Sequence, residues 1–175
     1  MGLKPQNIGT AMPHGQAGSY ARQPEMIVGT KPLGGAKAVA FGTPLEYDEK
    51  GNVVAMGATS TAADFVGIAA REVKSALTYL EQGTGVYAPH EPVSVFQRGC
   101  INVNCQKGTP KAGGKVYLRT VANESYPTAA VGGLEAEEDK NGDTSNTVEL
   151  TNCQWAGPKD ANGIAELRIL TMVNA

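Results

Sequence analysis

Residues 93–104 read VSVFQRGCINVN, and they carry the clearest sign of β structure in the chain. Within this stretch, Ile101 and Val103 alternate with Asn102 and Asn104. Successive side chains of a strand point to opposite faces, so such alternation is typical of a strand that buries only one face. The stretch therefore predicts a half-buried β-strand.

Other short segments along the chain have strand-like patterns. They lie at residues 36–42, 44–48, 53–56, 65–70, 115–121, 147–150 and 164–173. Residues 49–52, EKGN, have the composition of a turn and predict a hairpin that joins 44–48 to 53–56. Many short strands in series favour a closed sheet, because closure removes exposed edges. The predicted fold class is mainly β, a barrel or sandwich of short antiparallel strands.

Little helix is expected in this chain. It contains 22 glycines and 10 prolines among 175 residues, and both residue types interrupt long helices. The best helix candidate is 71–82, where Val73, Ala76, Leu77 and Leu80 have helical spacing. The sequence thus predicts at most one short helix.

The length of the chain predicts a single domain, since domains commonly span about 100–200 residues. Residues 26–175 are assigned to one β-rich domain, and residues 1–25 to an extended N-terminal arm. Within the domain, residues 132–146 combine glycines with several carboxylates and are expected to form a solvated acidic loop. These carboxylates are Glu135, Glu137, Glu138, Asp139 and Asp143.

The arm is interrupted by prolines and glycines, and its apolar residues follow no regular period. Two interpretations stay open, a disordered terminus and an arm that becomes ordered along a neighbouring protein. In the second interpretation, spaced side chains supply the contacts. The candidate partner-binding residues are Ile8, Met12, Tyr20 and Arg22.

Side chains able to carry out catalysis are few. The two histidines, His14 and His90, belong to no recognisable catalytic motif and are interpreted as surface loop residues. A stretch that starts at Asp139 superficially resembles a calcium loop. Its sixth and twelfth positions are Thr144 and Leu150, where an EF-hand needs glycine and glutamate. No catalytic residue, cofactor or metal site is predicted.

Charge and cysteine content exclude further classes. The net charge is −2 and the basic residues are scattered, whereas nucleic-acid binding needs concentrated positive charge. No apolar run approaches the roughly 20 residues of a membrane span.

The chain has an odd number of cysteines, and they lack metal-ligand spacing. They are Cys100, Cys105 and Cys153, and they are expected to be reduced thiols that pack as small hydrophobes. Trp155 is interpreted as a buried anchor. The chain is therefore expected to bind other proteins and not to be an enzyme.

Several pieces of the sequence resemble one family. The resemblance lies in 65–74 (FVGIAAREVK), 87–92 (YAPHEP) and 93–103 (VSVFQRGCINV), and 112–118 (AGGKVYL) extends it. These pieces are similar to the structural cement or head-decoration proteins of tailed bacteriophages. The terminal segment 164–173 fits the same pattern.

This resemblance implies a β-rich protein, made in the host cytoplasm, that binds the outside of the expanded phage head. There it would bridge neighbouring major capsid protein subunits and resist the pressure of packaged DNA. It also implies a homo-oligomer, for which a trimer is favoured over a dimer. Two alternatives stay open, a β module associated with the phage tail or fibre, and a small enzyme or ligand-binding barrel. The last would require a concave pocket with convergent polar groups.

Overall fold

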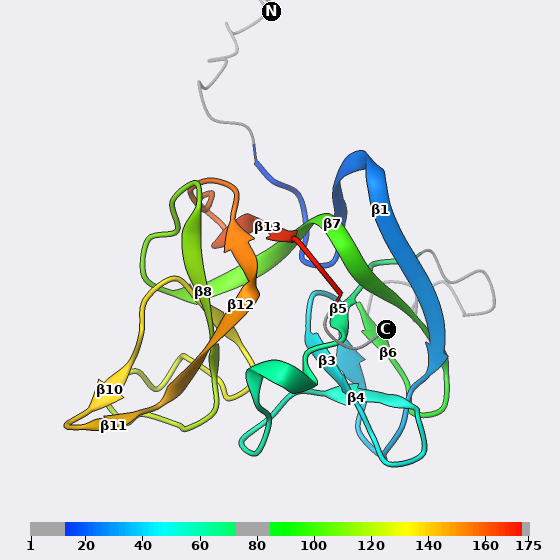
Figure 1. The fold of residues 1–175 in the computed structure, drawn as a ribbon, viewed down its shortest axis with the longest axis horizontal. Helices are drawn as coiled ribbons and strands as arrows, with labels where there is room; N and C mark the ends of the chain where they lie inside the picture. Colours follow the sequence, from blue (N-terminus) through cyan, green and yellow to red (C-terminus); the bar gives the residue numbers. More distant parts are fainter. Residues whose placement is uncertain (1–12, 73–84, 173–175) are drawn as a thin grey trace, which may run out of the picture.

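The computed structural model of the chain describes residues 13–72 and 85–172 (Figure 1). Its central element is β7 (Pro92–Lys107), a strand of 16 residues that has neighbouring strands along both edges. The predicted strand at 93–104 is confirmed, and it continues without a break through Gly99. That residue has φ 111°, and a Cβ atom there would lie 3.1 Å from the carbonyl oxygen of Glu25 in the neighbouring strand. Glycine is needed because a side chain would be strained and crowded at this point.

The second half of β7 belongs to a closed barrel. The barrel strands are β7, β9 (Leu134–Glu135), β8 (Gly114–Arg119), β12 (Thr147–Trp155) and β13 (Ile164–Ile169). The circle closes because β13 pairs with β7 as well as with β12. The β7–β9 ladder is parallel and the other four ladders are antiparallel. The predicted mainly β barrel is confirmed, and its sheet is mixed.

Apolar side chains from all five barrel strands fill the interior. Trp155 at the end of β12 has no exposed surface, and Ile101, Leu118 and Leu167 are equally buried. Full burial of a large apolar side chain contributes about 1.5–3 kcal/mol, so this cluster is a main source of stability. The expectation that Trp155 is a buried anchor is confirmed.

The first half of β7 carries a second group of strands. On one edge it pairs with β1 (Tyr20–Pro32), and on the other with β5 (Gly67–Ala69). Beyond β5 lie β3 (Pro44–Tyr47) and β4 (Val53–Ala55). A separate core fills this region, with Leu33, Leu45, Val53, Tyr87 and Val95 among its members.

The predicted hairpin over residues 44–56 is confirmed. Leu45 faces Ala55 across the β3–β4 ladder. In the turn, the Asp48 carboxylate accepts hydrogen bonds from the backbone amides of Lys50 and Asn52, at 2.9 and 2.8 Å. The segment 36–42 contributes only the short strand β2 (Val39–Ala40), which pairs with β6 (Val86–Tyr87) in a small sheet of its own.

Helical structure in the described residues is limited to one 3-10 turn at Ala62–Asp64. The predicted helix at 71–82 lies, from residue 73 onward, outside the described residues. Across residues 13–72 and 85–172, no helix has the length and apolar character that crossing a membrane requires.

Residues 13–25 pack against the β domain. The backbone amide of His14 donates to Asp160 Oδ2 at 2.9 Å, and Asn102 Nδ2 donates to the carbonyl of His14 at 2.7 Å. The amide of Gly18 donates to the carbonyl of Asn102 at 2.7 Å. Strand β1 then starts at Tyr20, so the boundary predicted after residue 25 falls inside a strand. The remainder of the predicted arm, residues 1–12, lies outside the described residues.

The segment 132–146 is not simply a solvated acidic loop. It contains β9, β10 (Lys140–Asn141) and β11 (Thr144–Ser145). Glu137, Glu138 and Asp143 are exposed, as expected. Glu135 and Asp139 are 0% and 3% exposed, so the prediction is wrong for these two carboxylates. They are buried because each has a cationic partner inside the protein.

Candidate binding surface

The structure places two of the four predicted partner-binding residues, Tyr20 and Arg22, at the start of β1. Ile8 and Met12 lie outside the described residues, and partner binding by all four stays a prediction. The Tyr20 ring is half-buried, with its centroid 5.7 Å from that of Phe96. Its hydroxyl donates to Glu72 Oε1 at 2.5 Å. Burial and the nearby Glu72 carboxylate raise the pKa of Tyr20 well above its ordinary value, so the phenol is neutral.

Arg22 is fixed by a carboxylate on a different strand. Its Nε donates to Glu166 Oε1 at 2.7 Å and its Nη2 donates to Glu166 Oε2 at 3.2 Å. The Arg22 side chain is 68% exposed, whereas Glu166 on β13 is 9% exposed. Burial alone would raise the pKa of Glu166, but the hydrogen bonds and positive charge of Arg22 outweigh it, and the pKa is lowered. The pair fixes the direction of an exposed guanidinium.

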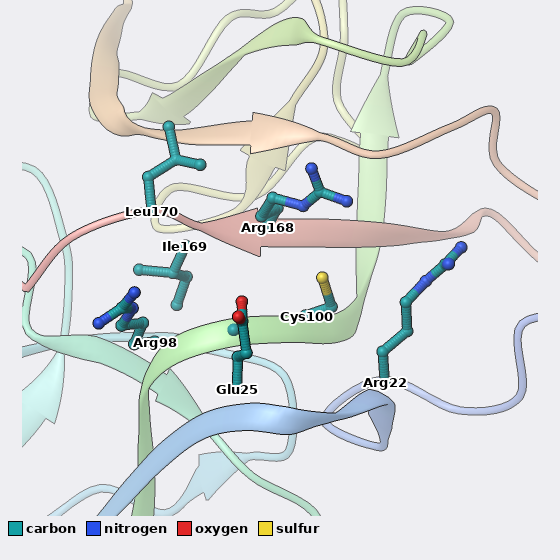
Figure 2. Close-up of a pocket in the computed structure, with 8 residues that line it drawn as sticks. Arg22, Glu25, Arg98, Cys100, Arg168, Ile169 and Leu170 are labelled. Atoms are coloured by element: carbon teal, nitrogen blue, oxygen red, sulfur yellow. The ribbon is translucent and has the colours of Figure 1, made fainter.

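Arginines from three strands lie around Cys100 and line the same pocket. Cys100 on β7 is the register partner of Arg22 on β1 and of Arg168 on β13. Side chains of directly opposed residues share one face of a sheet, so these three form a row across the strands. Arg98 precedes Cys100 by two residues on β7 and joins the group (Figure 2).

A pocket of about 480 Å³ lies between these arginines. It opens because β1 advances from Arg22 to Ile27 while β7 advances only from Cys100 to Arg98, so β1 bulges away from the sheet. Besides the arginines, Glu25, Gly99, Ile169 and Leu170 line it (Figure 2). The pocket therefore combines guanidinium groups with some apolar surface.

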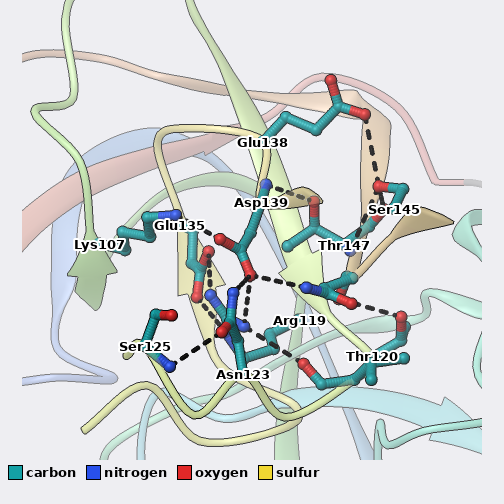
Figure 3. A network of polar contacts seen from close by, with 12 residues as sticks. Lys107, Arg119, Thr120, Asn123, Ser125, Glu135, Glu138, Asp139, Ser145 and Thr147 are labelled. Carbon is teal, nitrogen blue, oxygen red and sulfur yellow. Dashed lines mark hydrogen bonds and ion pairs between the residues drawn. The ribbon is translucent and has the colours of Figure 1, made fainter. Parts of the chain in front are cut away.

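A second cluster of charges is buried and serves the fold. Arg119 at the end of β8 binds Glu135 through two hydrogen bonds of 2.5 and 3.0 Å, and its Nη1 donates to Asp139 Oδ2 at 2.9 Å (Figure 3). Asp139 also accepts from Lys107 Nζ at 2.5 Å and from Asn123 Nδ2 at 2.8 Å. Each buried charge is thereby paired, as burial requires. The network ties the segment after β8 to the barrel.

The remaining candidate residues are in structural positions. All three cysteines are free and buried, which fits small hydrophobes. His90 is exposed in a loop, and the ring nitrogen Nε2 of His14 lies 3.0 Å from the carbonyl oxygen of Pro158. Within the described parts of the chain, no three histidine, cysteine or acidic side chains come together as metal ligands.

Arg22 was predicted from the sequence as a binding residue, whereas Arg98 and Arg168 were not. Both lie in predicted strands, at 93–104 and 164–173, with no local pattern that distinguishes them from ordinary solvent-facing residues. The signal that joins them is strand register, because Arg168 and Arg22 flank the same residue of β7. Register between distant strands could not be read from the sequence.

Comparison with known proteins agrees with the sequence-based resemblance. The family described as structural cement protein (E217 gp24/Pam3 gp6) matches residues 5–170. None of the curated proteins matches the chain in sequence. Among solved structures, a chain from "The capsid of Myoviridae Phage XM1" is similar, with a TM-score of 0.66 and 17% identity over 94% of each chain, a likeness in fold. The family is structural, so the predictions of a cement protein and of no enzymatic activity are confirmed, and the chain belongs to the phage structural cement protein family.

Proposed function

We propose that this cement protein bridges neighbouring major capsid protein subunits on the outside of the phage head. It would act as a homo-oligomer, with a trimer favoured over a dimer. Stabilisation of the particle then comes from surface contacts that hold adjacent subunits together against internal pressure. Multivalent attachment can raise avidity about 100–10,000-fold over one contact, so individually modest contacts suffice.

One structural observation carries this proposal, the attachment of the N-terminal segment to the barrel. His14 bonds to Asp160 and Asn102, and Gly18 bonds to Asn102, which belongs to β7. A pulling force that a capsid contact exerts on residues 1–12 would therefore be transmitted through these hydrogen bonds to β7, the central strand of the fold. A cement protein needs such a connection, because a contact can resist force only if its other end is held.

The same observation supports a binding role for the segment before residue 13. Ile8 and Met12 lie in that segment and are proposed to contact the capsid. Tyr20 and Arg22 differ from them, since both also bind within their own chain. In this proposal Arg22 presents its exposed guanidinium to the partner while Glu166 holds it in place.

Sedimentation with undecorated heads tests the proposal. Full-length protein is mixed with heads that lack cement protein, and saturable co-sedimentation at micromolar concentration is the expected result. A variant without residues 1–12 should bind more weakly and should keep the thermal stability of the full chain, because every described contact remains. Failure of the full-length protein to bind would contradict the proposal.

The oligomeric state has its own measurement. Sedimentation equilibrium of the free protein should give a multiple of the 18.2 kDa chain mass, three for the favoured trimer and two for the dimer. An electron-microscopy map of decorated heads should place the protein where it spans adjacent capsid subunits. A map with each copy on a single capsid subunit would contradict bridging.

A further inference from the structure

We propose that the pocket between β1, β7 and β13 binds carboxylate side chains from an acidic segment of a capsid subunit. Arg98 and Arg168, on different sides of the pocket, would each pair with one of these carboxylates. This inference rests on the proposed function and names the chemistry of one contact. No recognised motif in the sequence marks the two arginines, and only the fold brings them together.

The two arginines line the pocket from different strands. Arg168 extends from β13 and Arg98 from β7, and Cys100 lies on the pocket wall opposite Arg168 (Figure 2). Both arginines are exposed, so a partner can reach them. The wall also includes Ile169, which is 2% exposed, and Leu170, which is 42% exposed. The apolar part of an incoming acidic side chain can pack against that surface.

The bonding pattern leaves two guanidinium groups available. Arg22 is already bound to Glu166 by two hydrogen bonds. The side chains of Arg98 and Arg168 make no hydrogen bond or ion pair with any residue that the structure describes, although Arg168 lies near enough to Glu166 to lower its pKa electrostatically. The planar guanidinium forms paired hydrogen bonds with carboxylates, which makes free arginines suited to this ligand.

Charge complementarity favours an acidic partner. The three arginines face two carboxylates, Glu25 and Glu166, so the site has a net charge of +1 in a chain whose net charge is −2. A positive site on a negative protein directs binding toward an anionic surface. Nucleic acid fits less well, because backbone binding depends on many contacts between cations and phosphates, and this site offers two unpaired cations.

The test compares two double variants that remove the same charge. Arg98→Ala with Arg168→Ala removes the proposed ligands, and Lys37→Ala with Lys111→Ala removes two exposed cations elsewhere. Co-sedimentation with undecorated heads should show at least about tenfold weaker binding for the arginine variant, since buried arginine contacts are common energetic hot spots. The lysine variant should bind like the wild type. Salt should weaken wild-type binding more steeply than it weakens binding of the arginine variant.

The outcomes distinguish a failure of this inference from a failure of the proposed function. If the wild type binds heads and the arginine variant binds equally well, the inference is wrong while the proposed function stands. If the wild type does not bind heads, the proposed function fails first. Sedimentation of the free proteins and a gel shift with duplex DNA complete the test. If the arginine variant alone loses self-association, a second copy of the chain occupies the pocket, and if it alone loses DNA binding, a nucleic acid does; either result overturns the inference.

A conservative pair separates charge from shape. Arg98→Lys with Arg168→Lys keeps the positive charge but loses the paired hydrogen-bond geometry. Its binding should lie between those of the wild type and the alanine variant. Thermal unfolding of all variants should match the wild type, because both side chains are exposed and form no hydrogen bond or ion pair within the described residues.

Discussion

Arg119 and Glu135 form an ion pair that solvent does not reach. Arg119 Nε donates to Glu135 Oε1 at 2.5 Å and Nη2 donates to Oε2 at 3.0 Å, and both side chains are 0% exposed. Removing one partner of a buried pair leaves an uncompensated charge, which is more costly than never having buried the pair. The bond joins β8 to β9, the short strand that pairs in parallel with β7 to complete the barrel.

Replacement of Glu135 by leucine should therefore destabilise the protein by about 3–5 kcal/mol, the usual cost of breaking a buried ion pair. Urea unfolding measures this, followed by the fluorescence of Trp155, which is the only tryptophan and is fully buried. Lys115→Ala is the control, because it breaks the exposed pair with Glu149. The control should barely move the midpoint. Similar midpoints for the two variants would contradict the role assigned to Glu135.

Asp139 should make stability depend on pH. Burial raises the pKa of its carboxyl, but hydrogen bonds from Lys107, Asn123, Asn146 and Arg119 outweigh burial, so the pKa lies far below its ordinary value. The folded state then holds fewer protons than the unfolded state. The resulting stability is complete above the ordinary pKa of about 4 and is lost as pH falls below it. Urea midpoints measured from about pH 7 to about pH 3 should fall most steeply at the acid end.

The variant Asp139→Asn tests whether Asp139 causes the fall of the urea midpoint at acid pH. It should lower stability at neutral pH, because the ion pairs with Lys107 and Arg119 are lost. It should also flatten the decline below about pH 4, since the titrating group is gone. Asp143→Asn is the control, because Asp143 is exposed on the β10–β11 hairpin. Equal acid slopes for Asp139→Asn and the wild type would show that other carboxylates dominate.

Gly67 allows the close approach of β5 to β7. A Cβ atom at this position would overlap the carbonyl oxygen of Phe96 and lie 3.0 Å from Cγ1 of Val95. Because the obstruction is mainly backbone, Gly67→Ala should cost about 1–3 kcal/mol, the usual range for overpacking. Gly57→Ala is a matched control, since no heavy atom lies within 4 Å of the position that its methyl group would occupy. Thermal unfolding compares the two, and equal melting temperatures would rule out this steric role.

The sequence was informative where the relevant pattern is local. The alternation at 101–104 and the turn residues 49–52 are short-range features, and the structure has a strand and a hairpin there. The start of β1 was missed because its contacts come from elsewhere: Tyr20 packs on Phe96 and Arg22 binds Glu166. Its register with β7 is also irregular, so no period of two reveals it.

The binding surface was less predictable than the fold. Glu135 and Asp139 look like solvated loop residues in any local window, and only their pairing with Arg119 explains their burial. Arg98 and Arg168 become one site through the β7–β13 register. Such features depend on contacts between segments far apart in the sequence, which local propensity and periodicity do not encode.

Thiol reactivity should report on the arginine-lined pocket. Cys100 lies on its wall and is 9% exposed, whereas Cys105 and Cys153 are 2% and 5% exposed inside the barrel. Burial raises the pKa of Cys153 to about 12 and also raises that of Cys105, and the thiolate is the reactive form. A thiol-specific reagent should therefore modify one cysteine of the native protein first, and all three only after unfolding in urea.

The variant Cys100→Ser identifies that first thiol, and its native form should lose the fast phase while keeping two slow thiols. Persistence of the fast phase in Cys100→Ser would show that the barrel, not the pocket, is the accessible region. Bound to heads, the wild type should react more slowly at Cys100 than it does free in solution, because a capsid segment that fills the pocket would cover this residue of its wall. The rate at which Cys100 reacts in the bound wild type is compared with its rate in the Arg98→Ala, Arg168→Ala variant, at protein concentrations high enough to saturate the heads. Its Cys100 should stay reactive there, since the remaining contacts hold the protein on the capsid without filling the pocket.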